Sequence, residues 1–273
     1  MKSENEQGGN GEICRPDIDF NDKNLNIYQA QYPIHVYEVD PRGNLSVLSV
    51  CNFLQDAGSA HAAKLGISVL ELQNKNYTWV LARMKIRMHA YPFCRKQLKV
   101  YTWPSGCDRL FALRDFYVTD SGGRPVCSAV SSFVIIDTGN RRPVRVQSFI
   151  DQIKPVGVPH VLPDKPVKLP EPERLDLQQR FRVRYRDMDI NQHVNNVSYI
   201  EWAVESAPHH IKRNHLISEL EINFLREAVF GDCILGGCRA EDQSDNEFLH
   251  SMVRENDGLE VARARTVWMN GEL

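Results

Sequence analysis

The chain has 273 residues, of which 42% are hydrophobic, and its formal net charge is −2. This length exceeds that of an ordinary single domain, so we expect two domains or one large one. The near-neutral charge gives no reason to expect a nucleic-acid partner, and no apolar run approaches the roughly 20 residues that a membrane span requires.

The first residues, MKSENEQGGNGE, lack the apolar core of a secretory signal and are too acidic for an organelle transit peptide. We expect residues 1–26 to form a mobile polar tail. The seven cysteines are odd in number and scattered, which is typical of free thiols in a reducing compartment. Cys233 and Cys238 form the one close pair, and no second pair or nearby histidine completes a zinc site. The cysteines therefore favour a cytoplasmic protein without a bound metal.

Residues 27–150 begin with a short strand-like segment, YPIHVYEV, and continue into a helix candidate, LSVLSVCNFLQDAGSAHAAKLG. Four segments with alternating or β-branched residues follow and predict strands. These segments are WVLARMKIRM, QLKVYTW, LFALRDFYVTD and PVCSAVSSFVIID, with a turn signal at DSGGR. Residues 151–178 then hold six of the fourteen prolines and show little hydrophobic periodicity, which predicts an extended linker.

Residues 179–273 repeat this order. The segment FRVRYRDM precedes the helix candidate NNVSYIEWAVESAP, and the strand candidates are LEINFLRE, DCILGG, EFLHSMVREN and LEVARARTVWM, with a hairpin signal at NDG. One helix followed by four antiparallel strands, twice, indicates an α+β fold with internal duplication. Sliding the sequence along itself superposes Asp40 on Asp189, Arg42 on Asn191, Asn44 on His193 and, with a shorter offset, Tyr91 on Glu227. The second helix candidate is apolar on nearly every side, so we expect a curved sheet wrapped round it.

Short polar side chains gather immediately before the second helix, in the stretch YRDMDINQHVNNVSYIEW. Asp189, Asn191 and His193 stand at alternate positions of this stretch. A carboxylate can attack a carbonyl directly or act as a general base for water, and a neighbouring imidazole or carboxamide can orient the attack. The start of the helix, near residues 194–197, would add free backbone N–H groups and the positive end of the helix dipole, where negative charge develops.

Asparagines before a helix most often serve as N-caps without a catalytic role, and we expect Asn195 or Asn196 to be the cap. Two other chemistries fit the stretch poorly. A calcium-binding loop counted from Asp187 would need glycine and glutamate where Gln192 and Ser198 stand. Aspartyl phosphatases also place paired aspartates after a strand, but the α/β alternation of their fold is absent here.

The stretch DMDINQHVNNVSYIEWAVES closely resembles the fatty acyl-acyl carrier protein thioesterases of plants and bacteria. Further matches lie in YTWVLARMKIRMHAYP, ALRDFYV, SSFVIIDTGNRRPVR and LREA, so the resemblance spans about residues 28–270. It implies an α+β fold of two tandem hotdog domains, at 27–150 and 179–273, each a curved antiparallel sheet wrapped round a central helix. Ala228 stands where plant members commonly carry a cysteine, and no transit peptide precedes the fold, which favours a cytoplasmic bacterial member.

The resemblance implies hydrolysis of fatty acyl-acyl carrier protein (acyl-ACP) to free fatty acid and carrier protein, without a cofactor. It assigns catalysis to Asp189, Asn191 and His193 and a second carboxylate to Glu227. We expect Asp189 to act as nucleophile or base, with Asn191 and His193 orienting it and polarising the thioester, and Glu227 to activate or position water. A cysteine nucleophile is disfavoured because Ala228 has no thiol. Whether an acyl-enzyme anhydride forms stays open. Two alternative functions also stay open: an acyl-coenzyme A thioesterase of the same fold, and a non-catalytic acyl-binding regulator.

The resemblance also places the substrate. The acyl tunnel would run beside the first central helix, where Ala57 and Ala60 leave room for it. The carrier is a small acidic protein, so a cationic surface must capture it. The densest basic clusters are Arg141 with Arg142 and Lys212 with Arg213. Chain-length preference and oligomeric state stay open, with a homodimer as one option.

Overall fold

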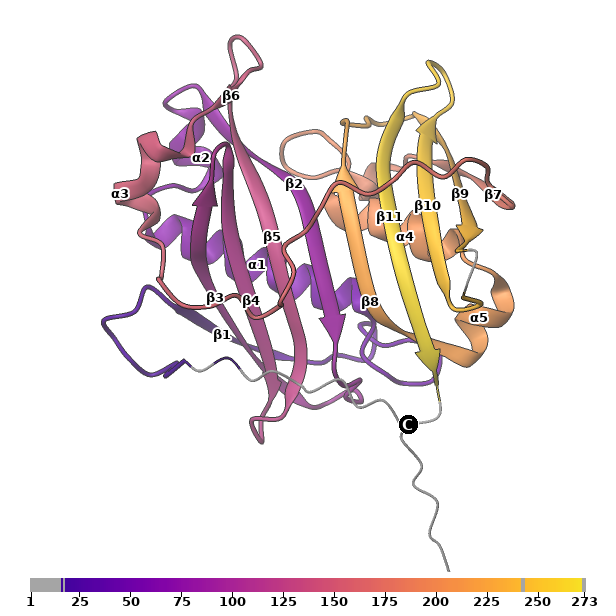
Figure 1. Cartoon of the computed structure of the whole chain (residues 1–273), viewed down its shortest axis with the longest axis horizontal. Helices are drawn as coiled ribbons and strands as arrows, with labels where there is room; N and C mark the ends of the chain where they lie inside the picture. The colour runs from indigo at the N-terminus through magenta and orange to yellow at the C-terminus, as the bar shows by residue number, and fades with distance from the viewer. Residues whose placement is uncertain (1–15, 17, 242–243, 272–273) are drawn as a thin grey trace, which may run out of the picture.

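The computed structural model describes residues 16, 18–241 and 244–271 (Figure 1). Its strands are β1 (Tyr28–Pro33), β2 (Tyr77–Met88), β3 (Gln97–Asp108), β4 (Phe111–Asp120), β5 (Pro125–Asp137), β6 (Pro143–Val144), β7 (Leu177–Arg182), β8 (His215–Phe224), β9 (Cys233–Ala240), β10 (Glu247–Arg254) and β11 (Glu260–Asn270). They form one antiparallel sheet in the order β1-β3-β4-β5-β2-β8-β11-β10-β9-β7, with β6 paired to β5.

Two central helices lie against the same face of this sheet, one in each half (Figure 1). The helices are α1 (Val47–Lys64), α2 (Val69–Gln73), α3 (Ile150–Ile153), α4 (Asn196–Ser206) and α5 (His209–Asn214), with 3-10 turns η1 (Val146–Phe149) and η2 (Tyr185–Asp187). The sheet and the central helix of each half confirm the predicted α+β architecture. None of the helices in the described residues is long and apolar enough to span a membrane.

Side-chain caps fix where the central helices begin. Ser46 accepts a hydrogen bond from the Ser49 N–H (3.1 Å) at the start of α1. Asn195 accepts one from the Val197 N–H (2.9 Å) at the start of α4, so the predicted asparagine cap is Asn195. A cap of this kind is worth about 0.5–2 kcal/mol, and it directs the preceding loop towards the helix end.

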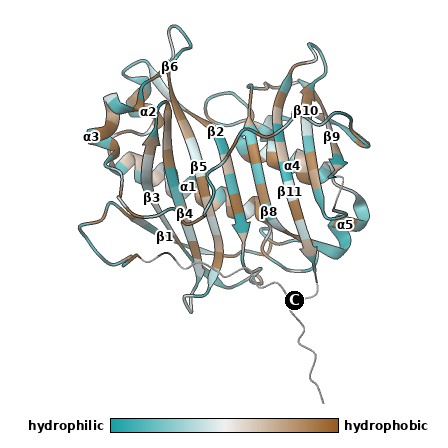
Figure 2. Ribbon diagram, in the orientation of Figure 1, coloured by the Kyte–Doolittle hydropathy of each residue, from teal (hydrophilic) through white to brown (hydrophobic). Residues whose placement is uncertain are grey.

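The two halves share one sheet and one apolar core. Strand β2 of the first half pairs with β8 of the second, and the guanidinium of Arg87 lies 2.7 Å from the Glu219 carboxylate across this junction. Hydrophobic and hydrophilic residues alternate along β2, β8 and β11 (Figure 2), as expected for strands with one face on a core. The main core cluster contains residues from both halves, among them Leu54 of α1 and Trp202 of α4.

The first strand of each half lies further upstream than predicted. Strands were expected at YPIHVYEV and FRVRYRDM, but β1 ends at Pro33 and β7 ends at Arg182. The reason is side-chain capture of the backbone. The Glu38 carboxylate accepts the His35 N–H (2.7 Å), and the Asp187 carboxylate accepts the Arg184 N–H (2.7 Å), so each chain turns out of its sheet at this point.

The segment between the halves crosses the outer face of the sheet, opposite the central helices (Figure 1). The predicted linker of residues 151–178 begins inside α3, and residues 154–176 contain no helix or strand. Buried side chains of β8 bind its backbone. Glu221 accepts a hydrogen bond from the Val167 N–H (2.6 Å), and Asn223 donates one to the Val167 carbonyl (2.9 Å).

Most of the predicted N-terminal tail, residues 1–15 and 17, lies outside the described residues. In the remainder, the ring of Phe20 stacks on Tyr101 (4.2 Å between centroids) and on Tyr117 (5.5 Å). The described end of the tail therefore packs on the sheet and is not a free polar segment.

Candidate active site

A tight loop between η2 and α4 carries three of the predicted catalytic residues. The Asp189 N–H donates to the His193 carbonyl (2.8 Å) and closes the loop. One carboxylate oxygen of Asp189 accepts the N–H groups of Asn191 (2.8 Å) and His193 (3.4 Å), while the other lies 3.4 Å from the Asn191 amide nitrogen. Gln192 takes a left-handed φ of 62°, which lets the chain turn round the carboxylate. The loop thus places the Asp189 carboxylate among its own backbone and the Asn191 side chain.

The same loop is present in the first half, where the chemistry differs. Asp40 accepts the N–H groups of Arg42 (2.9 Å) and Asn44 (2.9 Å), and its own N–H donates to the Asn44 carbonyl (2.7 Å). Gly43, with φ of 86°, occupies the left-handed position. The duplication predicted from sequence therefore extends to individual hydrogen bonds. The aspartate organises both loops, whereas the asparagine and histidine that follow it occur in the second half alone.

Glu227 lies on the segment after β8 and faces this loop. The His193 Nε2 is 3.4 Å from a carboxylate oxygen of Glu227. The Glu227 carbonyl accepts a hydrogen bond from Arg254 (2.9 Å), and the Ala228 carbonyl accepts one from the Val194 N–H (3.0 Å). The Val194 bond joins the segment to the loop and the Arg254 bond joins it to β10, so the predicted fourth residue lies beside His193.

Tyr199 of α4 forms hydrogen bonds to the backbone of the same segment. Its hydroxyl accepts the Ala228 N–H (2.8 Å) and lies 3.4 Å from the Arg226 carbonyl. Burial raises the pKa of Tyr199 above its usual value, which keeps the hydroxyl protonated and able to donate as well as accept. Its position one turn into α4 gave no sign of this role in the sequence.

Two residues of the first half also reach the site. Arg141, on the turn between β5 and β6, places a guanidinium nitrogen 2.8 Å from the Glu227 carboxylate. Gln73, at the end of α2, donates to the Asn191 side-chain oxygen at 3.3 Å. Arg141 was predicted as a carrier-docking residue, and Gln73 was not predicted at all. The first half thus contributes side chains to a site whose predicted catalytic residues all lie in the second.

Replacing Arg141 by glutamine should lower kcat about 10- to 100-fold while changing KM less. The guanidinium holds one face of the Glu227 carboxylate, and small displacements of a catalytic group are costly to rate. Steady-state kinetics on a short acyl thioester of pantetheine would measure both constants, and added guanidinium ion should restore part of kcat. Arg142→Gln is the matched control, because Arg142 lies on the same turn and, within the part of the chain that the structure describes, forms hydrogen bonds through its backbone alone. Equal losses in both variants would contradict a specific role for Arg141.

The helix start supplies fewer free N–H groups than expected. The N–H groups of Val194, Asn195 and Val197 donate to the Ala228 carbonyl (3.0 Å), the Asp187 carbonyl (2.8 Å) and the Asn195 side chain (2.9 Å). Within the described part of the chain, the Asn196 N–H is the one in this stretch that has no acceptor. The expectation of several free donors at residues 194–197 was therefore wrong, because the loop and its neighbour bind most of them.

The described cysteines do not contribute a nucleophile to this arrangement. The six described cysteines are free. Burial raises the pKa of Cys51 to about 12 and that of Cys238 to about 11, so these thiols stay protonated at neutral pH. Ala228, beside Glu227, is fully buried and has no sulfur. A cysteine nucleophile at this position is excluded by the residue itself.

The predicted substrate-contact residues lie in three places. Arg142 is exposed on the β5–β6 turn, beside the site. Lys212 and Arg213 lie in α5, beyond the opposite end of α4, and the Lys212 ammonium is bound to the Glu205 carboxylate at 2.9 Å. Ala57 is fully buried in α1, and Ala60 is partly exposed on the same helix. The structure therefore does not bring the two basic clusters together.

Comparison with known proteins places both halves in one family. The model for the acyl-ACP thioesterase N-terminal domain matches residues 25–153, and the model for the C-terminal domain matches residues 171–270. The chloroplastic dodecanoyl-[acyl-carrier-protein] hydrolase of Cinnamomum camphora is 28% identical over 260 residues, which are 89% of this chain and 67% of that protein.

Two solved structures match nearly the whole chain. The 12:0-ACP thioesterase from Umbellularia californica has a TM-score of 0.80 at 26% identity, covering 90% of this chain and 98% of its own. An acyl-ACP thioesterase from Bacteroides thetaiotaomicron has a TM-score of 0.72 at 27% identity, covering 89% and 98%. They confirm the expected tandem hotdog fold. With both of its halves matched, the chain belongs to the acyl-ACP thioesterase family.

Proposed function

We propose that this protein hydrolyses fatty acyl-ACP thioesters to free fatty acid and carrier protein, as part of fatty acid biosynthesis. The observation that carries the proposal is the meeting of His193 and Glu227 at 3.4 Å beside the loop that holds Asp189 and Asn191, in a chain of this family. Glu227 is distant from the loop in sequence, so it is the fold that brings its carboxylate to His193.

The reaction needs a nucleophile more than it needs an acid. The thiol released from a thioester has a pKa near ~8.5, so the thiolate leaves with little help at neutral pH. With Asp189 as the base, water adds to the carbonyl carbon and gives one proton to the Asp189 carboxylate. The carbon–sulfur bond then breaks and releases the carrier thiolate and the fatty acid. Asp189 acts as base or nucleophile, Asn191 and His193 orient this carboxylate and polarise the thioester, and Glu227 activates or positions the water. The free N–H of Asn196, at the start of α4, offers a donor to the developing oxyanion.

The proposal is tested by incubating the purified chain with a panel of acyl-ACPs of different chain lengths and measuring released fatty acid and free carrier thiol. Turnover on at least one member, abolished by His193→Ala, is the expected result. A folded protein that binds acyl chains without turning over any member would instead favour the non-catalytic regulator.

Substitutions on α1 should change chain-length preference if the acyl tunnel runs beside this helix, as we propose. Ala60→Leu narrows the space next to α1 and should shift the preference towards shorter chains, and Ala57→Leu should do the same. Product profiles on the acyl-ACP panel measure the shift, and thermal unfolding separates it from damage to the core. Ala63→Leu, at an exposed position of the same helix, is the control. Unchanged profiles in both test variants would remove α1 from the specificity determinants.

We also propose a cytoplasmic location, supported by the free cysteines of the described residues, since oxidising compartments favour disulfides. For carrier recognition, we retain the contact at Arg142, which lies beside the candidate active site, and withdraw the one at Lys212 and Arg213, because α5 lies beyond the opposite end of α4 and Lys212 is bound to Glu205.

A further inference from the structure

Exposed apolar side chains surround the candidate active site. Tyr185 and Ile190 are each 84% exposed, and Phe230 is 61% exposed. All three lie on the two segments that carry Asp189 and Glu227. The rings of Tyr185 and Phe230 meet edge to face with 6.4 Å between centroids, so exposed apolar groups of the two segments adjoin. Exposed apolar groups of this kind mark interaction sites when they are contiguous and rimmed by polar residues.

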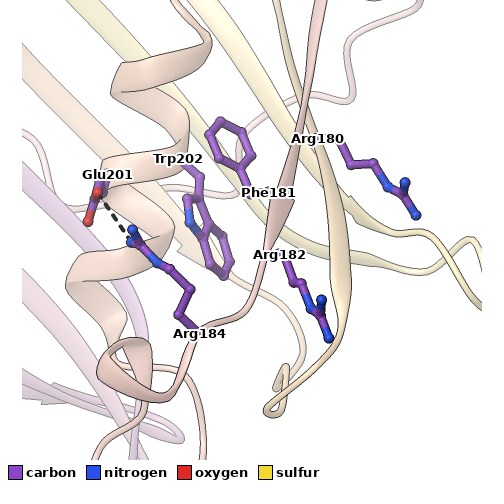
Figure 3. Close-up of a pocket in the computed structure, with 6 residues that line it drawn as sticks. All are labelled: Arg180, Phe181, Arg182, Arg184, Glu201 and Trp202. Carbon is purple, nitrogen blue, oxygen red and sulfur yellow. Dashed lines mark ion pairs between the residues drawn. The ribbon is translucent and has the colours of Figure 1, made fainter.

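Unpaired arginines flank this surface. Arg182 and Arg186 are exposed, and among the described residues neither has a carboxylate partner. Their neighbours differ, since Arg180 binds the Glu255 carboxylate (2.6 Å) and Arg184 binds that of Asp187 (2.9 Å). Figure 3 shows Arg182 projecting from β7 away from α4, while Arg184 turns towards the helix.

The arginines also border open hollows on the molecular surface. One hollow of about 340 Å³ is lined by Arg180, Arg182, Gly231 and Cys233. It adjoins the apolar surface, because Gly231 directly follows Phe230 and its N–H binds the Val183 carbonyl (3.2 Å). Arg182 therefore lines a hollow whose wall includes the residue that follows Phe230.

The internal duplication supplies a comparison within the molecule. The loop of the first half also exposes apolar residues, with Val36 at 65% and Tyr37 at 77%, so apolar exposure alone does not distinguish the two loops. The charge at matched positions distinguishes them. Strand β1 ends at Pro33, and the matched strand β7 ends at Arg182. After the turn that follows each strand, the first half has Tyr37 and the second half has Arg186 at the same position.

The second segment repeats this difference. Arg226 and Ala90 occupy the same position after their strands. Each donates its N–H group to the carbonyl of the second residue of the neighbouring strand, Val261 of β11 (3.1 Å) and Val126 of β5 (3.3 Å). The side chain of Arg226 is exposed and binds one backbone carbonyl, that of Glu260 (2.8 Å). Cations thus occupy three positions in the half that carries the candidate active site and none of the matched positions in the other half.

We propose that this catalytic rim, formed by Tyr185, Ile190 and Phe230 with Arg182, Arg186 and Arg226, is the docking surface for the acidic carrier protein. The inference rests on the proposed function and adds the surface that recognises the partner. An apolar centre with a cationic edge suits a small acidic protein that must hold its thioester over Asp189. The chain as a whole carries a charge of −2, so the attraction has to come from a local surface of this kind.

The test compares two thioesters of one fatty acid, acyl-ACP and the uncharged acyl-pantetheine, in the full-length chain. The double variant Arg182→Glu/Arg186→Glu should lower kcat/KM for acyl-ACP at least about tenfold and change kcat/KM for acyl-pantetheine less than about twofold. The salt dependence of the acyl-ACP reaction should weaken in the same variant. The matched control is Lys212→Glu/Arg213→Glu, which reverses the same number of charges in α5 and should leave acyl-ACP turnover near that of the wild type.

Three outcomes would overturn the rim as the docking surface. Equal losses on both substrates would indicate damage to the site itself. A loss confined to the control pair would move docking to α5. A change of oligomeric state in Phe230→Asp, measured by sedimentation and without a change in substrate preference, would make the rim a contact between copies of this chain. In each of these cases the proposed function stands as long as the wild type hydrolyses acyl-ACP, and it fails if the wild type does not.

Discussion

Asp189→Asn should lower kcat on acyl-ACP by about 10²- to 10⁴-fold, the range that a lost general base or nucleophile produces. Asparagine is the informative replacement because its side-chain oxygen can still accept the N–H groups of Asn191 and His193, which Asp189 binds at 2.8 and 3.4 Å. The loop should keep its shape while the negative charge is lost. Kinetics on acyl-ACP, together with thermal unfolding of the same preparations, would separate charge from folding.

Asp40→Asn is the matched control, since Asp40 binds its own loop in the same way at 2.9 Å. It should leave kcat unchanged, because Arg42 and Asn44 stand where the second half has Asn191 and His193. Near-normal turnover in Asp189→Asn would mean that Asp189 is a loop-organising residue like Asp40, and that the catalytic charge is elsewhere.

The second large effect is expected at the contact between His193 and Glu227. His193→Ala and Glu227→Gln should each lower kcat by about 10²- to 10⁴-fold, because the imidazole that polarises the thioester and the carboxylate that positions the water lie 3.4 Å apart and act together. Both variants should retain wild-type stability, as both side chains are substantially exposed. Single-turnover kinetics would show whether the loss lies in the chemical step.

The double variant His193→Ala/Glu227→Gln completes a double-mutant cycle, which measures whether the two losses in kcat are independent. Residues that act as one unit show strongly non-additive losses, so the double variant should be little slower than the worse single one. Multiplied losses would instead assign the two residues to separate steps of the reaction.

Alternation, β-branched residues and turn signals predicted most of the strands. PVCSAVSSFVIID was expected as a strand, and β5 spans Pro125–Asp137. The first strand of each half was misplaced because alternation in YPIHVYEV and FRVRYRDM mimics a strand, while the carboxylates of Glu38 and Asp187 bind the backbone and turn it away. Such local capture is set by side-chain geometry and leaves no period in the sequence.

The site was predictable where its residues are neighbours in sequence. Asp189, Asn191 and His193 stand close together, and Glu227 was predicted from the family resemblance. Arg141 and Gln73 come to the site across 86 and 118 residues through the shared sheet, and no local pattern indicates such contacts. The free N–H groups expected at the helix start were overestimated because their acceptors at Asp187 and Ala228 are properties of the folded loop.

The central claim, that this chain is a hydrolase of fatty acyl groups on a carrier protein, is tested most directly by one ratio. It is kcat/KM for acyl-ACP divided by kcat/KM for the coenzyme A thioester of the same fatty acid, measured at low salt with the wild-type chain. A ratio well above one that falls as salt is added is the predicted result, because the docking of an acidic carrier then contributes to association. A ratio of one or below at every salt concentration would contradict the carrier-protein assignment and make the protein an acyl-coenzyme A thioesterase of the same fold.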